Sequence, residues 1–167
     1  MTYYADLSPW DYLRGRIDGP LVSVGWLENG RPVSTGHVSG QFVDRLFELL
    51  RDPWQAGIAL AGWHSCDFCF RGEGPPPRPV KRGPKWVRVG IENLFVPGRG
   101  KIYVAPSMIL HYVDEHRYAP PSEFQQAVLD CPAMGSPDYL ETLTELGLAG
   151  QPAARPRRRR GPRPPAT

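Results

Sequence analysis

The stretch from residue 62 to residue 69 reads Gly-Trp-His-Ser-Cys-Asp-Phe-Cys, and it constrains this chain more than any other part of its sequence. Two of the three cysteines, Cys66 and Cys69, stand here with two residues between them, and His64 lies beside them. Thiolate and imidazole groups are the usual zinc ligands, and a C-x₂-C pair forms half of many structural zinc sites. The stretch therefore predicts a fold fastened by a metal whose remaining ligands come from elsewhere in the chain.

A second pair of ligands is expected at His111 and His116, where two histidines stand five positions apart. The 41 residues from 70 to 110 separate the two pairs, whereas a compact zinc finger has about a dozen. Closing so long a loop remains feasible, because the entropic cost grows slowly with loop length. On a regular helix the two histidines point about 140° apart, so they converge only if the helix loosens or ends at His116. The fourth ligand is therefore left open among His116, His64 and Cys131.

The alternative to a metal site is three reduced cysteines that pack as small hydrophobic residues. Reduced thiols are expected either way, because three cysteines in a chain whose N-terminus does not resemble a signal peptide indicate a reducing compartment. We therefore predict a cytoplasmic protein. The sequence has no apolar run of 18 or more residues, so no membrane span is predicted.

Charge divides the chain into two parts. Residues 151–167 contain six arginines and no acidic residue, so that 14 basic residues face all 17 acidic ones in residues 1–150. We predict one globular domain over 1–150 and a disordered Arg/Pro-rich tail over 151–167. The arginines of the tail are Arg155, Arg157, Arg158, Arg159, Arg160 and Arg163.

Apolar periodicity and turn residues predict the elements of the globular part. Residues 21–27 alternate as a strand does, and Ser39 is a good N-cap for a helix that ends near Arg51. Ser8-Pro9 has the composition of a helix start. The other predicted elements are a buried strand at 57–61, an exposed loop at 71–84, a β-hairpin of strands 86–92 and 101–105, and three helices. The first helix spans 107–116, the second is capped by Ser122 and ends near Leu129, and the third is opened by Ser136-Pro137 and ends near Leu146. Strands and helices are partly segregated along the chain, which favours an α+β fold with a small antiparallel sheet and C-terminal helices.

Three stretches also carry a resemblance to a known group of proteins. They are Tyr-Tyr-Ala-Asp-Leu-Ser-Pro at 3–9, the cysteine stretch at 62–69, and the histidine-bearing stretch at 105–124. The chain resembles an uncharacterised family of small proteins from high-GC bacteria over most of residues 3–146. The resemblance implies a single folded unit and supplies no activity.

The favoured hypothesis is a small binding or adaptor protein with an unidentified protein partner, whose α+β fold contains a zinc-stapled ββα or treble-clef-like unit. Its ligands would be Cys66, Cys69 and His111, with His116 or His64 as the fourth. An enzyme is the first alternative. It would be a dithiol oxidoreductase that uses the two cysteines, or a zinc hydrolase with Glu115 or Asp67 as general base.

Association with nucleic acid is the second alternative, and it depends on the tail. Six arginines can neutralise phosphates, so the tail could bind nucleic acid without sequence preference and with a strong dependence on salt. The tail contains no aromatic residue on which a base could stack. A solvated tail without a partner is therefore the simpler interpretation.

Overall fold

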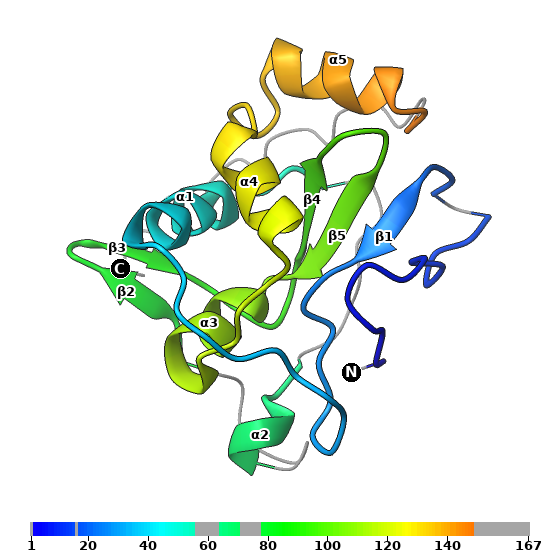
Figure 1. The fold of residues 1–167 in the computed structure, drawn as a ribbon. Helices are drawn as coiled ribbons and strands as arrows, with labels where there is room; N and C mark the ends of the chain where they lie inside the picture. The colour runs from blue at the N-terminus through cyan, green and yellow to red at the C-terminus, as the bar shows by residue number, and fades with distance from the viewer. Residues whose placement is uncertain (1, 16, 56–63, 71–77, 149–167) are drawn as a thin grey trace, which may run out of the picture.

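The computed structural model describes residues 2–15, 17–55, 64–70 and 78–148 (Figure 1). A three-stranded sheet lies at its centre, in the order β1-β5-β4, and a separate two-stranded sheet joins β2 to β3. Five helices of the described chain surround these sheets. The predicted α+β class is confirmed. The predicted strand at 57–61 and the tail at 151–167 lie outside the described residues.

Two buried five-residue strands form most of the central sheet, with β5 in its middle and β4 at one edge. Strand β4 (Asn93–Pro97) and strand β5 (Ile102–Pro106) are antiparallel and buried along their whole length. The tight turn between them has Gly98 donating its N–H to the Lys101 carbonyl at 2.9 Å. A Cβ at Gly98 would come within 2.5 Å of the Tyr103 ring, so the turn requires glycine for this close approach.

Strand β1 (Leu21–Ser23) pairs with β5 in parallel, so the sheet is mixed rather than purely antiparallel. It is shorter than the predicted strand at 21–27 because Gly25 turns the chain, with a φ of 75°. The N–H of Gly25 donates to the Asp6 carboxylate at 2.9 Å, and a Cβ there would approach the Ile109 side chain to 3.0 Å. The chain therefore leaves the sheet where it must pass closely over the helix that follows β5.

The predicted helix start at Ser8-Pro9 is wrong, because this segment covers the outer edge of β1. Pro9 forms an antiparallel bridge with Val22, and the N–H of Trp10 donates to the Leu21 carbonyl at 3.0 Å. The Ser8 hydroxyl donates to the carbonyl of Ala5 at 2.7 Å instead of capping a helix. An unpaired strand edge offers hydrogen-bonding groups to any extended segment, and here that demand outweighs the local capping signal.

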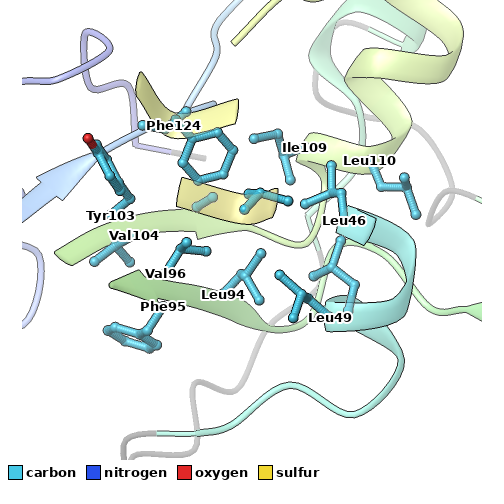
Figure 2. Close-up of a cluster of buried hydrophobic side chains, with 14 of the residues drawn as sticks. Leu46, Leu49, Leu94, Phe95, Val96, Tyr103, Val104, Ile109, Leu110 and Phe124 are labelled. Atoms are coloured by element: carbon cyan, nitrogen blue, oxygen red, sulfur yellow. The ribbon is translucent and has the colours of Figure 1, made fainter. Parts of the chain in front are cut away.

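Helices α1 and α4 pack against one another and against the sheet. Helix α1 (Gly40–Arg51) begins as predicted, with the Ser39 hydroxyl accepting the Phe42 N–H at 3.1 Å. Helix α4 (Ser122–Asp130) begins one residue earlier than predicted, so Ser122 is its first residue and Pro121 holds the cap position. Rings of Phe42, Phe124 and Tyr103 stack edge to face in the core, where leucines of α1 also meet β4 (Figure 2).

The remaining long helices are α3 (Ile109–His116) and α5 (Pro137–Glu145). Ser136 caps α5 as predicted, accepting the Tyr139 N–H at 3.2 Å. The Tyr139 hydroxyl donates to the Phe95 carbonyl at 2.8 Å, so α5 covers part of the outer edge of β4. None of the helices in the described ranges combines the length and apolar character that a membrane span needs.

The predicted hairpin is correct in its turn and its second strand and wrong in its first. Residues 85–87 belong to another hairpin, formed by β2 (Val80–Arg82) and β3 (Lys85–Val87), so the predicted loop at 71–84 contains a strand. Gly90, with a φ of 87°, ends the alternating pattern. Its N–H and those of the next two residues donate to the Ser107 hydroxyl at 3.0–3.3 Å, so residues 90–92 wrap around a side chain instead of pairing.

Candidate metal centre

The two cysteines of the C-x₂-C pair lie on one short turn of helix. Helix α2 (Asp67–Phe70) contains Cys69, and the N–H of Phe70 donates to the Cys66 carbonyl at 3.0 Å. The Asp67 carboxylate accepts the N–H of Asn29 at 2.8 Å, which fastens the turn to the loop after β1. Both thiols therefore project from a compact knuckle whose position is set at one end by a hydrogen bond.

The two histidines lie on α3, and the end of this helix at His116 explains how their side chains converge. The helix ends at His116, and Arg117 adopts a left-handed conformation with a φ of 54°. Its N–H donates to the Tyr112 carbonyl and closes the last turn. The Nε2 atoms of His111 and His116 lie 3.3 Å apart. The histidines thus converge in the way that the sequence allowed only for a helix that ends here.

The knuckle and the end of α3 bring four donor atoms into one group. The ligand atoms of Cys66, Cys69, His111 and His116 all lie within 4.8 Å of one another. The Nε2 atom of His116 lies 3.2 Å from the Cys66 sulfur and 3.4 Å from the Cys69 sulfur. The Cys69 sulfur lies 3.6 Å from Nε2 of His111.

These separations match the edges of a tetrahedral zinc site. With Zn–S bonds of about 2.3 Å and Zn–N bonds of about 2.0–2.1 Å, a sulfur and a nitrogen lie about 3.6 Å apart and two nitrogens about 3.4 Å apart. The observed sulfur–nitrogen separations are 3.2–3.6 Å, and the nitrogen–nitrogen separation is 3.3 Å. The four side chains could therefore hold a metal ion without moving far.

Burial sets the protonation of these groups in the absence of a metal. It lowers the pKa of His111 and of His116, which favours the neutral imidazole that a metal requires. Burial also raises the pKa of Cys66 to about 11, so the free thiol keeps its proton at neutral pH. Binding of a cation would release that proton, because only the thiolate is a ligand.

Aromatic side chains support the group from inside. The Phe68 ring, between the two cysteines, lies 5.7 Å from the Tyr112 ring and 5.2 Å from the His116 ring. Tyr112 is a buried residue of α3. Sequence reasoning did not identify Phe68 as a packing residue of the site, although an apolar residue between two ligands was the available signal.

The other candidate residues lie outside this group. His64 is half-buried and held by its backbone, whose N–H donates to the Gly90 carbonyl at 2.9 Å. Cys131 is buried at the end of α4, where burial raises its thiol pKa to about 12 and its carbonyl accepts a hydrogen bond from Arg45. It borders a groove of about 610 Å³ that also touches Tyr103. Neither residue belongs to the four that the described structure brings together.

The two candidate general bases differ in their surroundings. Asp67 already accepts a backbone hydrogen bond, and Glu115 is exposed on α3. The negative charge of Glu115 acts to raise the pKa of both neighbouring histidines, against the larger effect of their burial. Glu115 therefore places a negative charge beside the group, and it does not line the groove that borders Cys131.

Comparison with known proteins places the chain in a family. The model of DUF7919, a domain of unknown function, matches residues 2–129. The chain belongs to the DUF7919 family. The match agrees with the resemblance to an uncharacterised family, and within this DUF7919 domain lie all four residues of the metal group. Helix α5 lies beyond it. No curated protein and no solved structure matches the chain.

Proposed function

We propose that this DUF7919 protein is a small, non-catalytic binding domain whose fold is fastened by a structural zinc ion. The ligands are Cys66, Cys69, His111 and His116. One observation carries the proposal: four donor atoms from two segments far apart in sequence lie within 4.8 Å of one another. Unrelated side chains on a surface rarely converge in this way, and two thiols beside two imidazoles have no other evident reason to do so.

The chemistry of the donors selects zinc. Thiolates and imidazoles are soft or borderline ligands, and a tetrahedral set of two sulfurs and two nitrogens is typical of zinc. Calcium and magnesium prefer oxygen ligands, which the four residues do not supply. Three free cysteines in the described chain also agree with the reducing cytoplasm in which we place the protein.

A structural role follows from the number of ligands. Four protein ligands complete a tetrahedral zinc site, whereas catalytic zinc keeps one position for water. This argues against the hydrolase. The site also joins α2 to α3, and a four-residue helix such as α2 cannot be stable by itself. Zinc would supply the fastening that α2 needs.

The dithiol oxidoreductase is disfavoured by the state of the thiols. A reactive cysteine has a lowered pKa, typically from a helix N-terminus or a nearby cation. Burial instead raises the pKa of Cys66 to about 11. Two imidazoles also lie close to the sulfurs. This arrangement suits binding of a metal better than thiol–disulfide exchange with another molecule.

Elemental analysis of full-length protein purified without chelator tests the proposal. We expect about one zinc per chain, as a complete four-ligand site requires, and less than about half an equivalent would refute it. Cys66→Ser should lose the metal. Cys131→Ser is the matched control, because it removes a buried thiol outside the group and should keep the zinc. Equal zinc in both variants would show that the metal is bound elsewhere.

A further inference from the structure

The β2–β3 hairpin carries a concentration of positive charge. Residues 78–88 contain five basic residues and no acidic one. Outside this segment and the tail, the chain contains nine basic residues and all of its 17 acidic residues. The hairpin therefore forms a basic projection on an otherwise acidic domain, and it stands beside α1, on the opposite side from the N-terminal segment in Figure 1.

Two of these cations are neutralised by the domain itself. Arg82 contacts Asp44 of α1 at 2.6 Å and Asp114 of α3 at 3.7 Å. Lys85 contacts Glu48 of α1 at 2.8 Å. Together with the buried Val87, they form the face of the hairpin that packs on the domain. Their role is attachment.

Among the residues that the structure describes, the opposite face has no such partners. Lys81 lies directly across from Trp86 in the strand register, and Trp86 is 53% exposed. Arg88 places its guanidinium carbon 5.7 Å from the centre of the Trp86 ring. Arg78 is exposed just before β2. No acidic residue in the described ranges forms an ion pair with Arg78, Lys81 or Arg88.

We infer that this outer face, made of Lys81, Trp86 and Arg88, binds single-stranded nucleic acid. Proteins that bind single strands combine cations that follow the phosphates with an exposed aromatic ring on which a base stacks. The hairpin supplies both within a few residues. The inference gives a partner to the proposed binding domain and rests on that role, although it concerns a different face from the zinc site.

A single strand fits this face better than other polyanions do. The exposed indole of Trp86 offers a flat apolar surface on which a nucleobase can stack. In duplexes the bases are already stacked on one another and offer no free face. The tail differs from the hairpin here, because its six arginines have no aromatic residue among them. Binding by the tail must therefore be independent of Trp86.

Fluorescence anisotropy with the full-length protein and labelled oligothymidine or oligouridine tests the inference. Trp86→Ala should weaken binding by about five-fold or more, the usual effect of removing one base–aromatic stack. Trp86→Phe should restore most of the affinity. Tyr12→Ala is the matched control, because Tyr12 is similarly exposed at 48% but lies in the N-terminal segment. It should bind like the unmodified protein.

The cations are tested by the dependence of affinity on salt. Lys81→Glu and Arg88→Glu should each lower the slope of log K against log salt by about 0.7, the value for one lost phosphate contact on a single strand. Arg99→Glu changes the net charge equally at an exposed position on the β4–β5 turn, and it should leave the slope unchanged. A slope that changes equally in all three variants would overturn the assignment of these contacts.

Three other results would also overturn the inference. They are wild-type affinity in Trp86→Ala, equal binding of duplex and single strand, and Trp86-dependent binding of anionic phospholipid vesicles without binding of oligonucleotides. Preference for oligouridine or oligothymidine would tell whether RNA or DNA is favoured. Zinc is measured in each sample. Normal zinc without Trp86-dependent binding refutes this inference alone, whereas Trp86-dependent binding without zinc refutes only the proposed zinc site.

Discussion

Different kinds of contact stabilise two regions of this domain. One is the central sheet, and the other is the metal corner, which consists of α2 and the four residues of the metal group. Every residue of β4 and β5 is buried, and labelled side chains of α1, α3 and α4 lie around these strands (Figure 2). Helix α2 has no buried residue. Its attachments within the described residues include the sulfur–imidazole group, the contacts of Phe68 and a hydrogen bond from Asn29.

The difference indicates where the proposed zinc ion would contribute most to stability. The apolar area buried around the sheet can stabilise that region without help, since burying one large apolar side chain contributes about 1.5–3 kcal/mol. In the metal corner Cys66 is buried, but α2 itself contributes no buried residue. We therefore expect the two regions to respond differently to loss of metal and to loss of core packing.

Removal of zinc should have the largest effect. Structural zinc binds small domains with an apparent free energy of about 10–16 kcal/mol, part of which is folding free energy. Since this chain also has a core, we expect a fall in Tm of more than roughly 10 °C on treatment with a strong chelator. Hydrogen exchange should locate the loss first at the amides of α2. An unchanged Tm in metal-free protein would show that zinc does not stabilise the metal corner.

Loss of packing in the sheet core should lower stability without loss of zinc. Phe124 is fully buried and its ring contacts the rings of Phe42 and Tyr103. Phe124→Ala should lower the free energy of unfolding by about 3–5 kcal/mol, measured by denaturant titration. Zinc content should stay at one equivalent, because no ligand contacts this ring. Loss of zinc along with stability would mean that the corner depends on the core.

The success of the sequence analysis follows the same division. Helix α1, helix α5 and strand β5 were predicted because local signals and burial agree there: Ser39 and Ser136 cap their helices, and the strand is apolar throughout. The segment at Ser8-Pro9 failed because its conformation is set by the edge of β1, which is distant in sequence until the chain folds. The first strand of the hairpin failed for a similar reason, because Ser107 binds residues 90–92.

The sequence predicted which types of residue form the candidate site, but it did not determine which residue would be the fourth ligand. The cysteine pair and the two histidines were visible as zinc ligands from their chemistry and spacing. The choice among His116, His64 and Cys131 was not, because it depends on where α3 ends. The left-handed Arg117 decides that, and a non-glycine residue in this conformation has no reliable sequence signal.

A smaller effect is expected where α5 meets the sheet. The Tyr139 hydroxyl donates to the Phe95 carbonyl at 2.8 Å, although α5 lies beyond the residues that the family model matches. Tyr139→Phe should lower the free energy of unfolding by about 1–3 kcal/mol, because the buried carbonyl loses its donor. Tyr12→Phe removes the hydroxyl of an exposed ring and should change stability by less than about 0.5 kcal/mol. Equal effects would show that α5 is only loosely attached to the domain.

The smallest effect concerns the attachment of the basic hairpin to α1. The Glu48 carboxylate accepts hydrogen bonds from Lys85 at 2.8 Å and Arg51 at 2.7 Å, and these bonds lower its pKa. A carboxyl whose pKa is lowered by folding stabilises the native state above its unfolded pKa, and this contribution disappears as pH falls through the folded pKa.

Glu48→Gln should therefore melt slightly below the unmodified protein above about pH 5, and the two should converge near about pH 3. The difference should be small and should shrink at high salt, because both partners are exposed and screened. Glu141→Gln is the control, since Glu141 is exposed on α5 and has no basic partner among the described residues. A difference that persists at low pH would mean that the neutral amide disturbs packing. In that case packing of side chains attaches the hairpin to the domain, as it does in the sheet, and the ion pairs contribute little.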